Sequence, residues 1–388
     1  MSQKQLSILL APDSFKESLS ATAVCMAMAE GISKVNPQVN IISKPLADGG
    51  EGTLEALING NDGEIFYEEV FDPIGNKIKA PYGIIKSEKV AVIEMAKASG
   101  LMLVSLQNRN PLITTTYGTG QLIKACLEHD VKKIIICIGG SATNDGGVGA
   151  MQALGISFKD ANLQEVNWGG GNLHLIKIID DSNLDHRIKN VKIEVACDVQ
   201  NTLCGDFGAS KVFAKQKGAG ENAVAALEEN MLHYGKLLQS YCQEDIFTVK
   251  GLGAAGGLGS SLYALLKAEL RPGVDIVIEH YQLEKIIKDV DLIWTGEGSL
   301  DLQTAFGKAP LGLAKLAMKH HKFVIALTGK IGAGVECLQQ AGISAVFGII
   351  DQNSTDQELF AKAHTNISRT SENIMRLIYF KHNNEAIT

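Results

Sequence analysis

Short apolar runs alternate with segments of helical periodicity at the amino end of the chain. An apolar run at 6–11 precedes a helical pattern over 20–34, whose first turn Ser20 can cap. A second apolar run at 39–45 leads into another short helical pattern at 54–58. This strand–helix–strand–helix order predicts the start of a parallel sheet covered by helices.

The last third of the chain returns to the same alternation. Apolar runs at 291–294, 323–327 and 345–350 are interrupted by a helical pattern at 310–321, and a long helix is expected at 356–380. Together with the two runs at the amino end, these segments make five strands. Five is the number of strands in a flavodoxin-type doubly wound sheet.

The middle of the chain has its own succession of elements. Its expected strands are at 64–71, 77–85, 90–95, 133–138 and 191–197. Its expected helices are at 118–128 and 222–241, and the weakly patterned segment 158–190 is expected to be rich in loops.

These patterns predict an α/β fold class. We expect a flavodoxin-like doubly wound parallel sheet with a second α/β domain inserted between its second and third strands. Residues 1–70 plus 286–388 are expected to form the flavodoxin-like domain, and residues 71–285 the inserted domain. A chain of 388 residues usually divides into about two domains.

Composition and charge exclude several classes of partner. The formal net charge of -7 argues against a nucleic-acid partner, which requires a basic face. No apolar run is long enough to span a bilayer, so no membrane partner is expected. Seven scattered cysteines without a close pair are typical of reduced thiols, which predicts a cytoplasmic protein. Nothing in the pattern indicates an oligomeric state.

Candidate chemistry follows the first expected strand. Asp13, Ser14 and Lys16 place a carboxylate, a hydroxyl and a cation between that strand and the helix after it. A lysine near the start of a helix is electrostatically unfavourable, because the amino end of a helix is already positive. A bound anion would relieve this, whereas the structural alternative is an ordinary charged surface loop.

Two glycine-dense turns lead into helices. One contains Asp48, Gly49 and Gly50, and the other contains Gly139, Gly140 and Ser141. Successive backbone N–H groups in such turns can bind phosphate or carboxylate oxygens. The alternative is that the glycines only permit tight turns.

A third glycine pattern, GxGxxG at 251–256, matches the dinucleotide-binding fingerprint. With Glu279 as the acid that binds the ribose, it would indicate an NAD(P)-dependent oxidoreductase acting on a small hydroxy acid. The run before it is short and ends in Lys250, which argues against that alternative. The GxxxxGK[ST] pattern does not occur, so a P-loop kinase is excluded.

Taken together, these segments resemble the type I glycerate kinase family. The matching stretches are APDSFKESLSA (11–21), PLADGGEGT (45–53), IGGSATNDGGVGAMQALG (138–155), ACDVQNTLCG (196–205), GASKVFAKQKGA (208–219), GLGAAGGLG (251–259), RPGVDIV (271–277) and TGEGSLDLQTAFGKAP (295–310). The resemblance implies a kinase that transfers a phosphoryl group from ATP to D-glycerate, giving mostly the 2-phosphate. It also implies that the GxGxxG pattern is a turn of the inserted domain. Small departures from the family pattern occur at Thr202, Lys215 and Leu300.

Phosphoryl transfer then suggests a role for each candidate residue. The expected substrate- or phosphate-binding residues are Asp13, Ser14, Asp48, Gly49, Gly50, Gly139, Gly140 and Ser141. The expected catalytic residues are Lys16 as an anion contact, Asp198 as the base with Asp13 and Asp48 as rivals, and Lys308 as a group that neutralises phosphate charge. Glu297 and Asp301, on one turn at a strand end, are the expected Mg²⁺ ligands. A non-catalytic protein that binds a sugar acid remains the other alternative.

Overall fold

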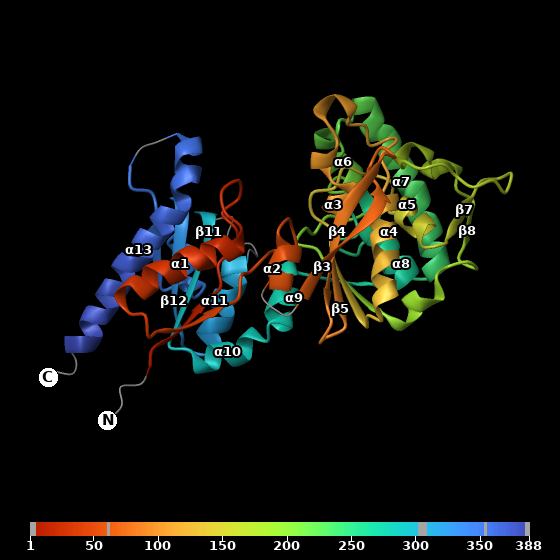
Figure 1. Cartoon of the computed structure of the whole chain (residues 1–388). Coiled ribbons are helices and arrows are strands. Elements are labelled where there is room, and N and C mark those ends of the chain that lie inside the picture. Colours follow the sequence, from red (N-terminus) through yellow and green to blue (C-terminus); the bar gives the residue numbers. More distant parts are fainter. Residues whose placement is uncertain (1–4, 60–62, 302–308, 353–354, 385–388) are drawn as a thin grey trace. The chain divides into compact units, whose positions relative to one another are not determined.

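The computed structural model describes residues 5–59, 63–301, 309–352 and 355–384 (Figure 1). Contacts divide the chain into two compact units. The first unit consists of Met1–Asp48, Glu55–Gly60 and Val274–Thr388, and the second unit consists of Gly49–Leu54 and Asn61–Gly273. Both units are mixed α/β with parallel strands, as the sequence predicts.

The first unit is built on a five-stranded parallel sheet. Its strands are β1 (Ser7–Leu10), β2 (Asn40–Ser43), β11 (Leu292–Leu300), β12 (Phe323–Ile331) and β13 (Ala345–Gly348). They lie in the order β13-β12-β11-β1-β2, with every neighbouring pair parallel. Numbered along the chain, this order is 2-1-3-4-5. Sheets of this order bind ligands beyond the carboxyl ends of the strands where the order reverses, here β1 and β11.

Helices cover both faces of this sheet. They are α1 (Ala21–Val35), α10 (Leu283–Asp289), α11 (Ala309–Lys319), α12 (Cys337–Gln340) and α13 (Asp356–Asn384). Ser20 caps α1 as expected, because its Oγ accepts a hydrogen bond from Ala23 N at 3.3 Å. Figure 1 shows α1 and α13 side by side, and a Cβ added at Gly31 would lie 2.1 Å from Ser368 O. Glycine is therefore required where these two helices cross.

The second unit has a six-stranded mixed sheet. Its strands are β3 (Gly63–Phe71), β4 (Lys77–Ile85), β5 (Val90–Glu94), β6 (Lys133–Cys137), β9 (Lys192–Ala196) and β10 (Glu269–Arg271). In the order β10-β9-β6-β5-β4-β3, the first four strands pair in parallel, whereas β4 pairs antiparallel with both β5 and β3. A separate two-stranded hairpin consists of β7 (Ser157–Lys159) and β8 (Ile178–Asp180).

The helices of the second unit pack around a large apolar core. They are α3 (Ala96–Ser99), α4 (Tyr117–Cys126), α5 (Val148–Ala153), α6 (Ala209–Phe213), α7 (Glu221–Cys242) and α8 (Leu258–Leu266). The short 3-10 segments are Leu101–Leu103, Leu106–Asn108, Leu127–His129, Gly170–Leu175, His186–Asn190, Lys215–Lys217 and Ala254–Gly257. Two further helices, α2 (Thr53–Asn59) and α9 (Gly273–His280), contain residues of both units.

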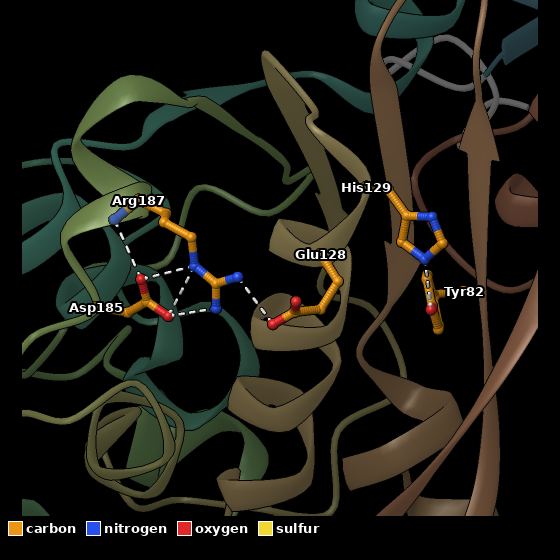
Figure 2. Close-up of polar contacts among 5 residues, drawn as sticks. All are labelled: Tyr82, Glu128, His129, Asp185 and Arg187. Atoms are coloured by element: carbon orange, nitrogen blue, oxygen red, sulfur yellow. Dashed lines mark hydrogen bonds and ion pairs between the residues drawn. The ribbon is translucent and has the colours of Figure 1, made fainter.

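Polar contacts fix the carboxyl end of α4 (Figure 2). The guanidinium group of Arg187 donates three hydrogen bonds to Asp185 and one to Glu128 Oε1 at 2.8 Å. The next residue, His129, shares a 2.9 Å hydrogen bond with the hydroxyl group of Tyr82 on β4. The end of α4 is thus tied to the sheet on one side and to a loop on the other.

Two features differ from the sequence-based expectation. The boundary expected at residue 70 cuts through β3, but β3 pairs along its whole length with β4 and is part of the second unit. The first unit in turn includes residues 274–285, which were expected in the inserted domain.

Strands β11 and β12 are longer than expected and end at Leu300 and Ile331, not at Trp294 and Leu327. Their polar, glycine-containing ends stay extended because the two strands pair with each other through Leu300 and Ile331.

All seven cysteines lie in the described residues and are free thiols. None of the helices in the described ranges combines the length and apolar character that crossing a bilayer requires.

Candidate functional site

Three carboxylates of the first unit act on one another: those of Asp13, Asp48 and Glu297. Asp13 follows β1 and Glu297 lies on β11, and both are almost fully buried. Asp13 N donates to Gly296 O at 2.8 Å, which ties the end of one strand to the other. Burial, together with the nearby charges of Asp48 and then Glu297, raises the pKa of Asp13 to about 7. This carboxyl group is therefore poised to exchange a proton near neutral pH.

The cation that the sequence predicts lies beside this cluster. Lys16 is exposed, and its Nζ lies 4.0 Å from Asp48 Oδ2. It occupies a tight turn closed by pairing between Phe15 and Leu19, while Ser14 N donates to Asp13 Oδ1 at 2.6 Å. The structure thus brings Asp13, Ser14, Lys16, Asp48 and Glu297 together. Carboxylates outnumber cations among them, which favours a bound cation.

The expected pair of metal ligands has a different geometry from the one predicted. Glu297 and Asp301 were expected on one turn, but Glu297 lies within β11 and Asp301 follows the end of that strand. An extended strand rises about 3.3 Å per residue, so their Cα atoms are about 13 Å apart along it. Lys308 lies outside the described residues. Within the described parts of the chain, no group of three or more histidine, cysteine, aspartate or glutamate side chains is arranged to hold a metal ion.

The two predicted glycine turns meet in the second unit. A Cβ added at Gly139 would lie 3.3 Å from Gly50 Cα, so the two turns are in contact at the end of β6. Gly49 has a φ of +83° and approaches the end of β9, where a Cβ added to it would lie 2.7 Å from the Cβ of Ala196. Gly140, with a φ of +74°, is also in a conformation that side chains disfavour. The backbones of the two glycine turns therefore lie close together.

The turn at 49–54 is fixed by a buried carboxylate that sequence reasoning missed. Glu94, at the end of β5, is only 2% exposed, and its Oε1 accepts a hydrogen bond from Leu54 N at 2.8 Å. Burial raises its pKa. Lys97 Nζ lies 3.7 Å from Glu94 Oε2 and 3.5 Å from Glu51 Oε1. In the sequence, the feature that could have indicated Glu94 is its position as the single carboxylate at the end of an otherwise apolar strand.

The second glycine turn is fixed from the protein interior by a buried lysine, Lys217. Sequence reasoning did not identify this residue. Lys217 Nζ donates to Ser141 Oγ at 2.8 Å and to Thr143 O at 2.6 Å. Lys217 is 2% exposed, and burial lowers its pKa to about 7. Asp145 lies before the helix that follows the turn, and its carboxylate accepts hydrogen bonds from Thr116 and from the amides of Gly147 and Gly149.

Asp198 was expected as a base at the end of a buried strand, but β9 ends two residues earlier and Asp198 is exposed. Its Oδ1 accepts a hydrogen bond from Gly273 N at 3.0 Å. This contact ties the segment after β9 to the start of α9.

The GxGxxG pattern does not form a dinucleotide-binding turn. The residues before it form turns and bends in place of a strand, and Ala254–Gly257 is a 3-10 segment. A Cβ at Gly253 would lie 2.1 Å from Thr202 O, and one at Gly256 would lie 2.0 Å from Thr143 O. These glycines allow close backbone packing inside the second unit, which contradicts the oxidoreductase alternative.

Comparisons with known proteins agree with these motifs. A family model described as the glycerate kinase family matches residues 8–379. The glycerate 2-kinase of Escherichia coli K12 is 47% identical over 95% of this chain and 97% of its own length. The glycerate kinase of Bacillus subtilis 168 is 44% identical over the same shares of the two chains. A crystal structure of a protein provisionally named glycerate kinase 2 from Salmonella typhimurium LT2 superimposes with a TM-score of 0.90 at 42% identity, covering 98% of this chain and 100% of that one.

Proposed function

The chain belongs to the glycerate kinase family, and on that premise we propose that it transfers the γ-phosphoryl group of ATP to the 2-hydroxyl group of D-glycerate. The observation that carries the proposal is the family match over residues 8–379. The choice of the 2-hydroxyl rests on the name of the Escherichia coli relative.

The glycine turns supply the groups that such substrates need. ATP and glycerate are both anions, and the adjoining turns at Gly49–Gly50 and Gly139–Gly140 offer backbone N–H groups for their oxygen atoms. Ser141, Ser14 and the exposed Lys16 are the proposed side-chain contacts for phosphate or carboxylate oxygens. Lys308 remains a proposed cation for the phosphates.

Asp13 is the proposed general base. In the transfer, the 2-hydroxyl oxygen forms a bond to the γ-phosphorus, the bond from that phosphorus to the β,γ-bridging oxygen breaks, and ADP leaves. The hydroxyl proton passes to a carboxylate. A pKa of about 7 makes Asp13 well matched to this step at neutral pH. The exposed Asp198, expected from the sequence, is the second candidate.

The carboxylates beside Asp13 fit a Mg²⁺ ion. Magnesium is commonly held by one or two carboxylates together with phosphate oxygens and water. Glu297 and Asp48 both raise the pKa of Asp13, so negative charge is concentrated there, as a divalent cation requires. We propose Glu297 as the main ligand with Asp48 or Asp301 as the second. When bound, the ion would neutralise charge on the phosphates.

A fold type and a cellular location are proposed together with the function. The strand order 2-1-3-4-5 of the first unit supports a flavodoxin-like domain that holds an inserted α/β domain. The use of ATP and the free thiols support a cytoplasmic location.

A coupled assay of ADP release tests the proposed activity. The purified protein with ATP and Mg²⁺ is supplied with D-glycerate, L-glycerate, glycerol or D-lactate. We expect turnover with D-glycerate and much slower turnover with glycerol, which lacks the carboxylate. Absence of ADP release with D-glycerate would contradict the proposal.

A further inference from the structure

Lys217 is an unusual residue to find in a protein interior. It lies at the end of the 3-10 segment Lys215–Lys217 and is 2% exposed. Long charged side chains are almost never fully buried unless they are paired. No salt bridge of Lys217 is present among the described residues, although the charge of Asp145 acts on its ammonium group. An apolar residue would fill the same space without desolvating an ammonium group.

The hydrogen bonds of Lys217 are directed at one segment. Its Nζ donates to the Ser141 hydroxyl group and to the Thr143 carbonyl group, both in the turn that begins with Gly139 and Gly140. Burial lowers its pKa to about 7, so the lysine is retained against a substantial desolvation cost.

The same turn contains buried polar atoms without hydrogen-bond partners. Thr143 Oγ1 and Asn144 Oδ1 have none among the described residues. Buried polar groups are nearly always paired in folded proteins. This segment is therefore held in a conformation that its own side chains do not fully satisfy, and the contacts from Lys217 maintain it.

We propose that Lys217 is a positioning residue for phosphoryl transfer, which fixes the Gly139–Ser141 turn from the protein interior so that its N–H groups are preorganised for a substrate or phosphate anion. This role rests on the proposed function. Lys217 does not contact the reacting atoms, and it acts through Ser141 and the backbone of Thr143. Its positive charge below the turn also favours an anion bound there.

Steady-state kinetics of four variants test the role. Lys217→Met keeps an unbranched side chain that is one atom shorter and removes both hydrogen bonds. Ser141→Ala removes one acceptor and leaves the bond to Thr143. The double variant measures whether the two residues act as a unit. Lys215→Met is the matched control, because Lys215 belongs to the same segment but is exposed and pairs with Glu221 at 2.6 Å.

We expect Lys217→Met to lower kcat/KM by about 100-fold, the effect of a misplacement of about 1 Å in a catalytic site. The KM for the anion bound at the turn should rise while kcat falls. Ser141→Ala should lower kcat/KM by about tenfold. The double variant should be no worse than Lys217→Met, because residues that act as a unit are not additive. Lys215→Met should match the wild type.

Several results would overturn the role. A folded Lys217→Met protein with near-normal kcat and KM would do so, as would losses that add fully in the double variant. If thermal melts show that Lys217→Met is not folded, the kinetics of Ser141→Ala test the positioning role instead. Normal kinetics for Ser141→Ala would contradict that role. A wild-type protein without ATP-dependent turnover of glycerate contradicts the proposed function instead. In that case, weaker binding of inorganic phosphate to Ser141→Ala than to the wild type, measured by calorimetry, still tests the turn.

Discussion

Replacing Gly49 by alanine tests whether the first glycine turn depends on close backbone approach. Gly49 has a φ of +83°, and an added Cβ would lie 2.7 Å from the Cβ of Ala196 and 3.2 Å from Gly273 Cα. The chain offers a matched control in Gly52, which has a φ of +92° but no atom within 4 Å of an added Cβ. Both alanine variants incur the conformational cost, and only Gly49→Ala adds a steric overlap.

The expected losses of stability follow from the conformational cost and the steric overlap. A left-handed conformation costs a non-glycine residue about 1–2 kcal/mol, so Gly52→Ala should lose about that much stability. Overpacking adds about 1–3 kcal/mol, so Gly49→Ala should lose about 2–5 kcal/mol. Removing the Cβ of Ala196 in a Gly49→Ala/Ala196→Gly double variant should restore part of the difference, because it removes the shortest contact.

Urea denaturation followed by tryptophan fluorescence measures these changes. The chain has two tryptophans, and Trp168 lies in the second unit while Trp294 lies in the first. A Trp294→Phe background shared by every variant lets Trp168 report the second unit alone. Equal losses for Gly49→Ala and Gly52→Ala would refute the steric argument. So would an Ala196→Gly change that gives Gly49→Ala no recovery.

Three further predictions concern single side chains. Lys16→Ala should lower kcat by about 100-fold or more with an unchanged melting temperature, because Lys16 is exposed and serves the substrate; near-normal kinetics would remove it from the site. Asp13 has a raised pKa of about 7, so the folded protein retains a proton that the unfolded chain loses near pH 4, and stability should fall as pH rises from about 4 to 7. Asp13→Asn should abolish turnover and flatten that pH dependence in metal-free urea titrations, and an unchanged slope would contradict the assignment. Arg187→Ala should cost about 1 kcal/mol, since it loses partly exposed bonds to Asp185 and Glu128, and it should leave kcat unchanged.

The cluster of charged residues in the first unit could be predicted because it follows from strand order. Parallel strands end at the same edge of a sheet, so turns that follow such strands are close in space although far apart in sequence. The contact between Gly50 and Gly139 does not follow from that rule, because the preceding strands, β2 and β6, belong to different sheets. The cluster of Asp13, Asp48 and Lys16 follows from the same rule in the first unit.

The ends of β11 and the exposure of Asp198 could not be predicted in this way. Gly296 and Gly298 suggested a turn, but they lie in an extended strand because β12 pairs with it there. A Cβ at Gly296 would lie 2.3 Å from Leu327 O, so this glycine allows close approach between strands in place of a turn. Local composition does not distinguish these two uses of glycine.

Lys217 and Glu94 were missed for a different reason. Each is a single charged residue whose surroundings in the sequence resemble an ordinary surface segment or strand. Their burial depends on residues far away in sequence, such as Ser141 for Lys217 and Leu54 for Glu94. Only tertiary structure shows that each fixes a glycine turn.

The most direct test of the central claim is proton-coupled phosphorus NMR of the product formed from ATP and D-glycerate. The account predicts a phosphate resonance split into a doublet by the single proton on carbon 2, which identifies the 2-phosphate. A triplet from the two protons on carbon 3 would show that the 3-hydroxyl group is the acceptor. Absence of any phosphate ester, with ATP unconsumed by a folded protein, would contradict the assignment as a glycerate kinase.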